Sequence, residues 1–391
     1  MSEEEEKEKL LDKSNNAFVD FVSNTFGESG KEFLLKNSKT ISKLKRANRN
    51  KIENFVRENK PLKEPIMPST EGTGGPMEEG MIYVMFNSNE GESPDIFDTV
   101  YRFFWVNAPS LPFSFFDTFL VSETYKSSIW VKVSNRGIFK NLSKTRFHQE
   151  INIKECDLEF DGIWKEGYKL IFHDKKMDIK GNLTFESLDP KGVLVYYNDR
   201  VVITPSMAVR WYDIFAIKVT GEIEINGKKI NISDGRGIIE HLLGIFSNLH
   251  VYDWRWLNLQ FPEGAVHLFY ISLDLEDEGI FEAGEGAAVM NGKWYHFQPG
   301  DFQIKEVAYG EDVDIPTKVP IEWKVTAGKD SSGNPLLDLN MVSTSKLSYL
   351  GSMGKGNEYV TNYVLNANGT WGGKPIKGKG TMENQMHRMI K

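Results

Sequence analysis

The pattern of apolar and polar residues divides the chain into three parts. In residues 1–60, apolar positions recur at roughly helical spacing among many Glu, Lys and Asn residues, which predicts two or three helices broken near Gly27 and Gly30. Residues 61–80 contain four prolines and four glycines, a density that no helix or central strand tolerates. This segment is expected to be a linker.

Beyond the linker the pattern is typical of β-strands. Short runs of β-branched and aromatic residues, such as residues 128–133, alternate with turn residues. Hairpin turns are predicted at Asn198-Asp199, Asn226-Gly227 and Asn291-Gly292. Long helical periodicity is scarce, so residues 81–391 are predicted to be mainly antiparallel β.

A seven-residue segment occurs twice in this β region. Residues 235–241 (Gly-Arg-Gly-Ile-Ile-Glu-His) resemble residues 378–384 (Gly-Lys-Gly-Thr-Met-Glu-Asn), and each copy follows a turn that contains a Gly-Lys pair. Cutting after the first copy gives segments 81–245 and 246–391, each of a size that suits an up-and-down barrel. We expect two antiparallel barrels in tandem, each closed by the repeated strand. A match of this length can also arise by chance.

Composition narrows the class of protein. A chain of 391 residues with 40% hydrophobic side chains can bury a large core, and its net charge of −8 argues against nucleic acid as a partner. It has one cysteine, Cys156, no uncharged apolar stretch of about 18 residues and an acidic start at residues 1–6. These features favour a cytoplasmic location.

Residues 36–60 form a basic segment with nine Lys or Arg residues against two Glu residues. Ile41, Leu44, Ile52 and Phe55 lie nearly on one face of the predicted helix. Such a helix can contact an anionic membrane surface or a partner. The commoner alternative is that its apolar stripe packs against the rest of the chain.

Glu240, in the first copy of the repeat, is the candidate general acid. Protonation of a C=C bond needs a carboxyl group held neutral by an apolar setting, and Ile238 and Leu242 would share the face of Glu240 on a strand. His241 would point to the opposite face. The alternative is a structural ion pair between Glu240 and a neighbouring Lys or Arg, which Glu383 in the second copy makes credible.

Aromatic residues surround the repeat and could stabilise a carbocation through their ring faces. Trp254 and Trp256 are two residues apart and share one face of a strand, and Trp211 and Tyr212 precede the first copy. Segment 101–119 is also strongly aromatic and is expected to form a lid over a lipid-like ligand or the first strands of a barrel.

These motifs resemble the carotenoid 1,2-hydratase/AttH-like family, a two-domain, lipocalin-like group. The likeness runs from about Phe160 to Gly264, with a weaker likeness up to Glu383. It is carried by Arg210-Trp211-Tyr212-Asp213, the Asn226-Gly227 turn, residues 235–244 and Asp253-Trp254-Arg255-Trp256.

The resemblance implies a non-redox reaction in which an acid protonates an isoprenoid or polyene, and water or an internal nucleophile captures the cation. The catalytic positions would fall on Glu240 and His241, with an upstream set at Arg210, Trp211 and Tyr212. The chain departs from the family pattern at several of these positions. Glu240 replaces an aspartate, Ile238 stands for a tyrosine, Leu243 for a tryptophan, and the upstream histidine is missing.

Three functions are therefore considered: an acid-dependent hydratase or cyclase, a carrier of a hydrophobic small molecule, and an interaction module that uses residues 36–60. In the carrier, Trp211, Trp254 and Trp256 would line a cavity and Glu240 would have only a structural role. The candidate ligand-binding residues are Arg210, Trp254 and Trp256. No cofactor or metal is expected for any of the three functions. A cavity with Glu240 in its wall would favour the enzyme, whereas a cavity without convergent polar groups would favour the carrier. Collapsed barrels would favour the interaction module.

Overall fold

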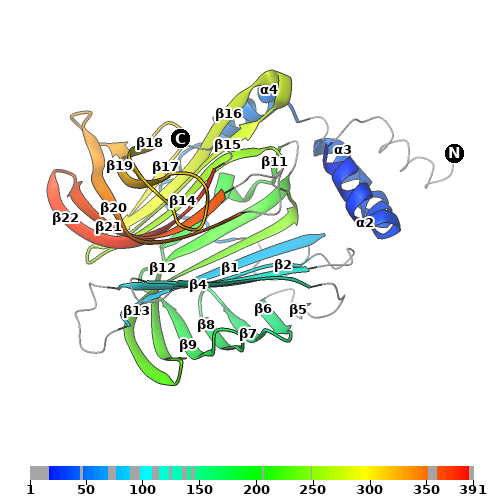
Figure 1. Ribbon diagram of the computed structural model, residues 1–391. Coiled ribbons are helices and arrows are strands. Elements are labelled where there is room, and N and C mark those ends of the chain that lie inside the picture. Colours follow the sequence, from blue (N-terminus) through cyan, green and yellow to red (C-terminus); the bar gives the residue numbers. More distant parts are fainter. Residues whose placement is uncertain are drawn as a thin grey trace.

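The computed structural model describes residues 17–44, 47–68, 76–88, 97–107, 114–122, 126–133, 139–141, 146–204, 207–247, 249–350 and 359–386. Residues 1–16 of the expected extension lie outside these ranges. The protein is built from two large antiparallel sheets, with α2 and α3 at one side (Figure 1). The predicted mainly β architecture with two antiparallel halves is therefore confirmed.

The extension contains three described helices, α2 (Ala17–Lys36), α3 (Ser38–Leu44) and α4 (Arg49–Glu58). α2 is interrupted at Gly27, where a φ of 54° lies in the left-handed region that glycine tolerates. Ile41 and Leu44 pack with Phe246 at the end of the first sheet, and Ile52 joins the core between the sheets. The apolar stripe of residues 36–60 is thus covered by the sheets. None of the described helices is both long and apolar enough to cross a membrane.

The first sheet has thirteen strands. Eleven are hydrogen-bonded in the order β4-β3-β2-β1-β13-β12-β9-β8-β7-β6-β5, and β10 and β11 pair with β12. Their bounds are β1 (Met77–Phe86), β2 (Thr99–Asn107), β3 (Ser114–Val121), β4 (Lys126–Val133), β5 (Phe139–Asn141), β6 (Phe147–Asn152), β7 (Cys156–Ile163), β8 (Gly167–Asp174), β9 (Ile179–Ser187), β10 (Val193–Val195), β11 (Val202–Ile203), β12 (Ala208–Ile225) and β13 (Lys228–Ile245).

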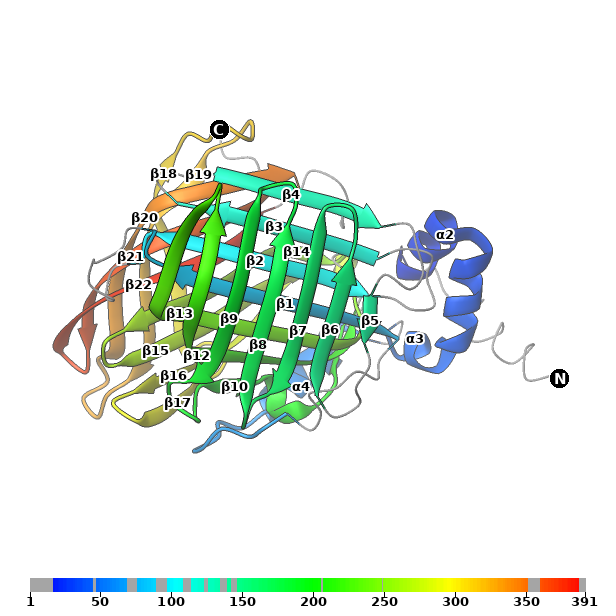
Figure 2. The same ribbon diagram turned by 90° about the horizontal axis from the view of Figure 1, so that it is seen from below.

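This sheet curls over itself, so that β1–β4 lie across β6–β9 (Figure 2). The core inside the curl includes Ile82, Trp105 and Phe160. The outer strands β7 and β8 alternate between buried and more exposed residues, as expected when one face meets solvent. β1 is instead buried along nearly all its length, because one face meets this core and the other faces the second sheet.

The second sheet has nine strands in the order β17-β16-β15-β14-β22-β21-β20-β19-β18. Their bounds are β14 (Val251–Phe261), β15 (Gly264–Asp274), β16 (Ile280–Met290), β17 (Lys293–Phe297), β18 (Phe302–Gly310), β19 (Val319–Lys329), β20 (Pro335–Leu350), β21 (Tyr359–Trp371) and β22 (Lys374–Met386). Its own core, around Trp323 and Tyr363, is separate from that of the first sheet.

The two copies of the repeat occupy equivalent strands. β13 contains residues 235–241 and pairs with β1, the first strand of its sheet, while β22 contains residues 378–384 and pairs with β14, the first strand of the second sheet. Each half therefore joins its last strand to its first. Among the described strands neither order links its two outer members, so each half is a curled sheet rather than a closed barrel.

The linker expected at residues 61–80 is shorter than predicted, because β1 already begins at Met77. Gly80 belongs to this strand and pairs with Trp105 of β2. A Cβ atom on Gly80 would lie 2.2 Å from Cζ2 of the Trp105 ring. The Trp105 ring thus occupies the space that a side chain at position 80 would need.

Two of the three predicted hairpin turns are confirmed. Asn226-Gly227 joins β12 to β13, and Asn291-Gly292 joins β16 to β17. The hairpin at Asn198-Asp199 is wrong, because β10 and β11 both pair with β12. Tyr197 to Asp199 all have positive φ angles, and the Tyr197 N–H donates to Glu285 of the second sheet over 2.7 Å. This connection is held by the other half of the molecule.

The substitution Gly80→Ala should destabilise the protein by about 1–3 kcal/mol, because the added methyl group overlaps the Trp105 ring. Urea unfolding would measure the loss. In a double-mutant cycle with Trp105→Phe, the two losses should sum to more than the loss of the double variant. Strictly additive losses would show that the indole does not determine the need for glycine.

Candidate functional site

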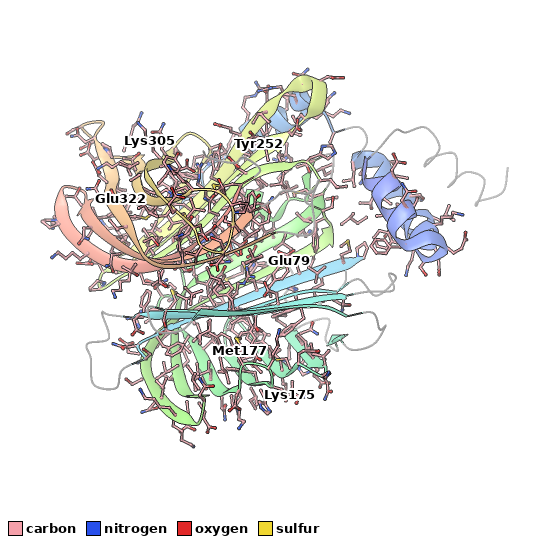
Figure 3. The ribbon with its side chains drawn as sticks, in the orientation of Figure 1. Glu79, Lys175, Met177, Tyr252, Lys305 and Glu322 are labelled. Carbon is pink, nitrogen blue, oxygen red and sulfur yellow. The ribbon has the colours of Figure 1, made fainter. Side chains whose placement is uncertain are left out.

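A cavity of about 120 Å³ lies between the two sheets. Figure 3 shows Glu79 at this junction. The apolar part of its wall consists of Met81, Phe104, Met207, Trp211, Leu242, Phe246, Val251, Trp254, Trp256, Phe269, Ile271 and Val360. The polar part consists of Glu79, Arg102, Asp117, Glu240, Tyr349, Glu383 and Gln385. The wall is thus mostly apolar, with a convergent set of ionisable groups.

Glu240 lies on β13, directly opposite Met81 of β1 and Asp213 of β12. Its side chain is 3% exposed, its Oε2 atom has no hydrogen-bond partner, and it forms no ion pair with any described residue. Burial and then the field of Asp213 raise the pKa of Glu240 well above its usual range. The surroundings of this group therefore favour the neutral carboxylic acid over the carboxylate.

Asp213 lies on the same face as Glu240 and is bound from both sheets. Its Oδ2 atom accepts hydrogen bonds from the Tyr196 hydroxyl (2.6 Å) and from Nε1 of Trp256 (3.2 Å). The same oxygen lies 2.8 Å from Nε2 of His267 on β15. These contacts hold a fully buried carboxyl group beside Glu240 and link the two halves.

Arg102 of β2 joins the sheets at the other side of the cavity. Its guanidinium pairs with Asp117 of β3 and with Glu383 of β22, and donates to the Tyr349 hydroxyl of β20 over 3.0 Å. Glu383 also accepts from Nε1 of Trp254 over 3.1 Å. Burial raises the pKa of Asp117 to about 6, although Arg102 opposes this shift. The cluster is a charged contact with almost no solvent around it.

Glu79 of β1 completes the acidic part of the wall. Burial, followed by the field of Glu383, raises its pKa to about 8, while Arg102 has the opposite effect. Glu79 faces Leu242 across the β1–β13 pair, so it is a diagonal neighbour of Glu240 on the cavity face. Two weakly acidic carboxyl groups therefore adjoin in one wall.

The structure brings four of the sequence-predicted site residues to the cavity, namely Trp211, Glu240, Trp254 and Trp256. His241 and Tyr212 lie on the opposite face, where the Tyr212 hydroxyl is 3.0 Å from Nδ1 of His241. The other ring nitrogen of His241 is 2.8 Å from Glu78. Arg210 is exposed. Strand alternation thus separates His241 from Glu240, as the residue spacing predicts.

Sequence reasoning missed Arg102, Asp117 and Glu79 as site residues. Arg102 is a lone charge within the apolar strand 99–107, a pattern that often marks a buried functional group. Glu79 falls within residues 61–80, whose prolines and glycines predict a linker rather than a strand. The aromatic segment 101–119 supplies β2 and β3 rather than a lid, as far as it is described, and Phe104 from it lines the cavity.

Within the described ranges, no three His, Cys, Asp or Glu side chains are arranged to hold a metal ion. The wall instead combines a buried carboxyl group whose neutral form is favoured, aromatic rings and a paired guanidinium. Such a set can donate a proton to an apolar ligand and stabilise positive charge on it.

Comparison with known proteins identifies the fold. No family model and no curated protein sequence matches the chain. Among solved structures, an AttH-like protein (NE1406) from Nitrosomonas europaea aligns with a TM-score of 0.60 at 12% identity, over 83% of this chain and 99% of that one. The protein therefore has the two-domain, lipocalin-like fold that its motifs indicate.

Two further structures align over similar lengths. Kievitone hydratase from Nectria haematococca has a TM-score of 0.55 at 12% identity, covering 84% of this chain and 96% of its own. CghA, solved with Sch210972, has a TM-score of 0.59 at 9% identity, covering 84% of this chain and 95% of its own. At these identities the likeness establishes the fold alone.

The substitution Arg102→Met should cost about 3–5 kcal/mol of stability, because Asp117 and Glu383 would remain buried without a cation. Urea unfolding at neutral pH would measure this loss. Adding Asp117→Asn and Glu383→Gln to the same chain should restore at least half of it. A loss below about 1 kcal/mol in the single variant would mean that the cluster acts like an exposed ion pair.

Glu79 should make stability depend on pH. Its pKa in the folded state is about 8, against 4.5 for the free side chain, so the folded protein binds more protons between these values and loses stability as pH rises. Relative to Glu79→Gln, the free energy of unfolding of the parent should fall by up to about 1.4 kcal/mol per pH unit in this window. The exposed control Glu186→Gln should parallel the parent. Parallel curves for Glu79→Gln would contradict the assignment.

Proposed function

We propose that the protein is an enzyme that catalyses an acid-dependent, non-redox hydration or cyclisation of a hydrophobic isoprenoid or polyene. The observation that carries the proposal is the buried carboxyl group of Glu240, which lines a mostly apolar cavity. Among the residues that the structure describes, it has no counterion and its Oε2 atom has no hydrogen-bond partner. A carboxyl group in this state is a proton donor at neutral pH.

In the proposed reaction the Glu240 carboxyl group transfers its proton to one carbon of a C=C bond, and a cation forms on the substrate. Water can capture the cation and return a proton to the Glu240 carboxylate, which gives hydration. Alternatively, a second C=C bond attacks the cation and loss of a proton gives a cyclised isomer. In both cases the acid is regenerated and no electrons are exchanged.

The aromatic wall supports this chemistry. The Trp211 ring stacks on Tyr196 at 4.1 Å between centroids and meets Phe269 edge-on at 4.3 Å, so its orientation is held by packing. Nε1 atoms of Trp254 and Trp256 are bound by Glu383 and Asp213. Rings held in this way offer preorganised faces to a developing cation.

The alternatives fit the cavity less well. A carrier needs an apolar cavity but has no use for an uncompensated buried acid, which costs stability. An interaction module would not need a cavity at all. The fold is also that of a protein named as a hydratase, kievitone hydratase, which is in keeping with the proposal.

The test is to identify by mass spectrometry the hydrophobic molecules that co-purify with the protein and to incubate them with parent and variant. Glu240→Gln keeps the shape of the side chain but removes its acidic proton. Turnover should fall by about 10²–10⁴-fold, while the dissociation constant of the ligand changes little. Glu186→Gln, on the outer surface, should retain the parent rate.

The same experiment separates the alternatives. Conversion at the parent rate by Glu240→Gln would overturn the assignment of the acid. A co-purified ligand that the parent protein binds and leaves unchanged would instead indicate a carrier.

A further inference from the structure

The cavity wall contains more carboxyl groups than cationic groups. Four carboxyl groups line it, those of Glu79, Asp117, Glu240 and Glu383, against the single guanidinium of Arg102. Arg102 is already paired with Asp117 and Glu383. Within the described wall, Glu79 and Glu240 are therefore left without a counterion.

The two remaining carboxyl groups are close together and face the same space. Glu79 is opposite Leu242, and Glu240 is opposite Met81. The two glutamates are therefore diagonal neighbours on β1 and β13, and the Cα atoms of such neighbours are roughly 7 Å apart. The field of Glu79 makes ionisation of Glu240 less favourable. A positive charge placed between them would favour an ionised carboxylate beside it.

Independent of the number of charges, Glu240 is a lining residue with an unsatisfied atom. Its Oε2 atom is buried without a hydrogen-bond partner among the described residues, although buried polar atoms in proteins almost always have one. Trp211, Trp254 and Trp256 line the same space. An N–H donor that is also a cation would satisfy both features.

We propose that the cavity takes a ligand whose apolar skeleton carries a positive charge, a hydrophobic amine bound as its ammonium ion, with Glu79 as its counterion. This inference rests on the proposed function, because the cation formed by protonation of a C=C bond would be stabilised by the same wall. The ammonium ion is a stable analogue of that cation.

The two glutamates would then have different tasks. Glu79 is half-buried and Glu240 is buried, so a ligand cation ionises Glu79 more readily and leaves Glu240 protonated. The charged and titratable groups that face Glu79 are Arg102, which favours its ionised form, and Glu383, Asp213 and Glu240, which oppose it. Glu79 is therefore the carboxyl group that should lose a proton when a cation binds.

Isothermal titration calorimetry of the full chain with octylamine, 1-octanol and octanoate tests the inference, because the three probes share one apolar chain. Octylamine should bind about tenfold more tightly than octanol, and octanoate should bind more weakly than both. At pH 7, below the pKa of about 8 of Glu79, octylamine should release up to about one proton, measured in buffers of different ionisation enthalpy.

Variants assign the effect to a residue. Glu79→Gln should lose both the preference for octylamine and the proton release, whereas Glu240→Gln and the exposed control Glu186→Gln should keep the preference. Equal affinities for octylamine and octanol, or an unchanged preference in Glu79→Gln, would overturn the charge inference and leave the acid mechanism standing. No binding of octylamine would likewise overturn the charge inference, whereas the acid mechanism is overturned only by undiminished turnover in Glu240→Gln.

Discussion

The structure depends on the burial of charged side chains between two apolar sheets. Arg102 of the first sheet bonds to Asp117 on its own sheet and to Glu383 and Tyr349 on the other, and Asp213 accepts from Trp256 and lies beside His267. Such groups are costly to bury unless each finds its partner. They therefore determine how the two halves meet, and the space left between them becomes the cavity.

The same constraint explains why two copies of one strand have different chemistry. Glu240 and Glu383 occupy corresponding positions of the repeat, and both line the cavity. Glu383 is neutralised by Arg102 and bonded by Trp254, as in the structural alternative that the sequence leaves open. Glu240 faces Asp213 and Glu79 instead, so its charged form is disfavoured. One glutamate stabilises the contact and the other is left as an acid.

Much of the fold could be predicted from local patterns. Alternation, the Asn-Gly turns and the repeat predict two antiparallel halves, and the separation of Glu240 from His241 follows from strand geometry alone. The failures have long-range causes. Gly80 belongs to a strand because of Trp105, and the Asn198-Asp199 connection is held by Glu285 in the other half. Arg102 and Glu383 meet across 281 residues of chain, a distance that no local pattern encodes.

The cavity lies between the two halves, because buried side chains occupy the core of each half. Large side chains such as Trp105 and Phe160 fill the core inside the first curled sheet, and Trp323 and Tyr363 belong to the core of the second. The cavity that contains Glu240 lies at the junction instead, and residues of β1, β13, β14 and β22 contribute to its wall. A duplicated fold thus creates a site that neither half contains. Because both halves contribute ionisable groups, the chemistry of the site depends on their relative placement as much as on the residues of either one.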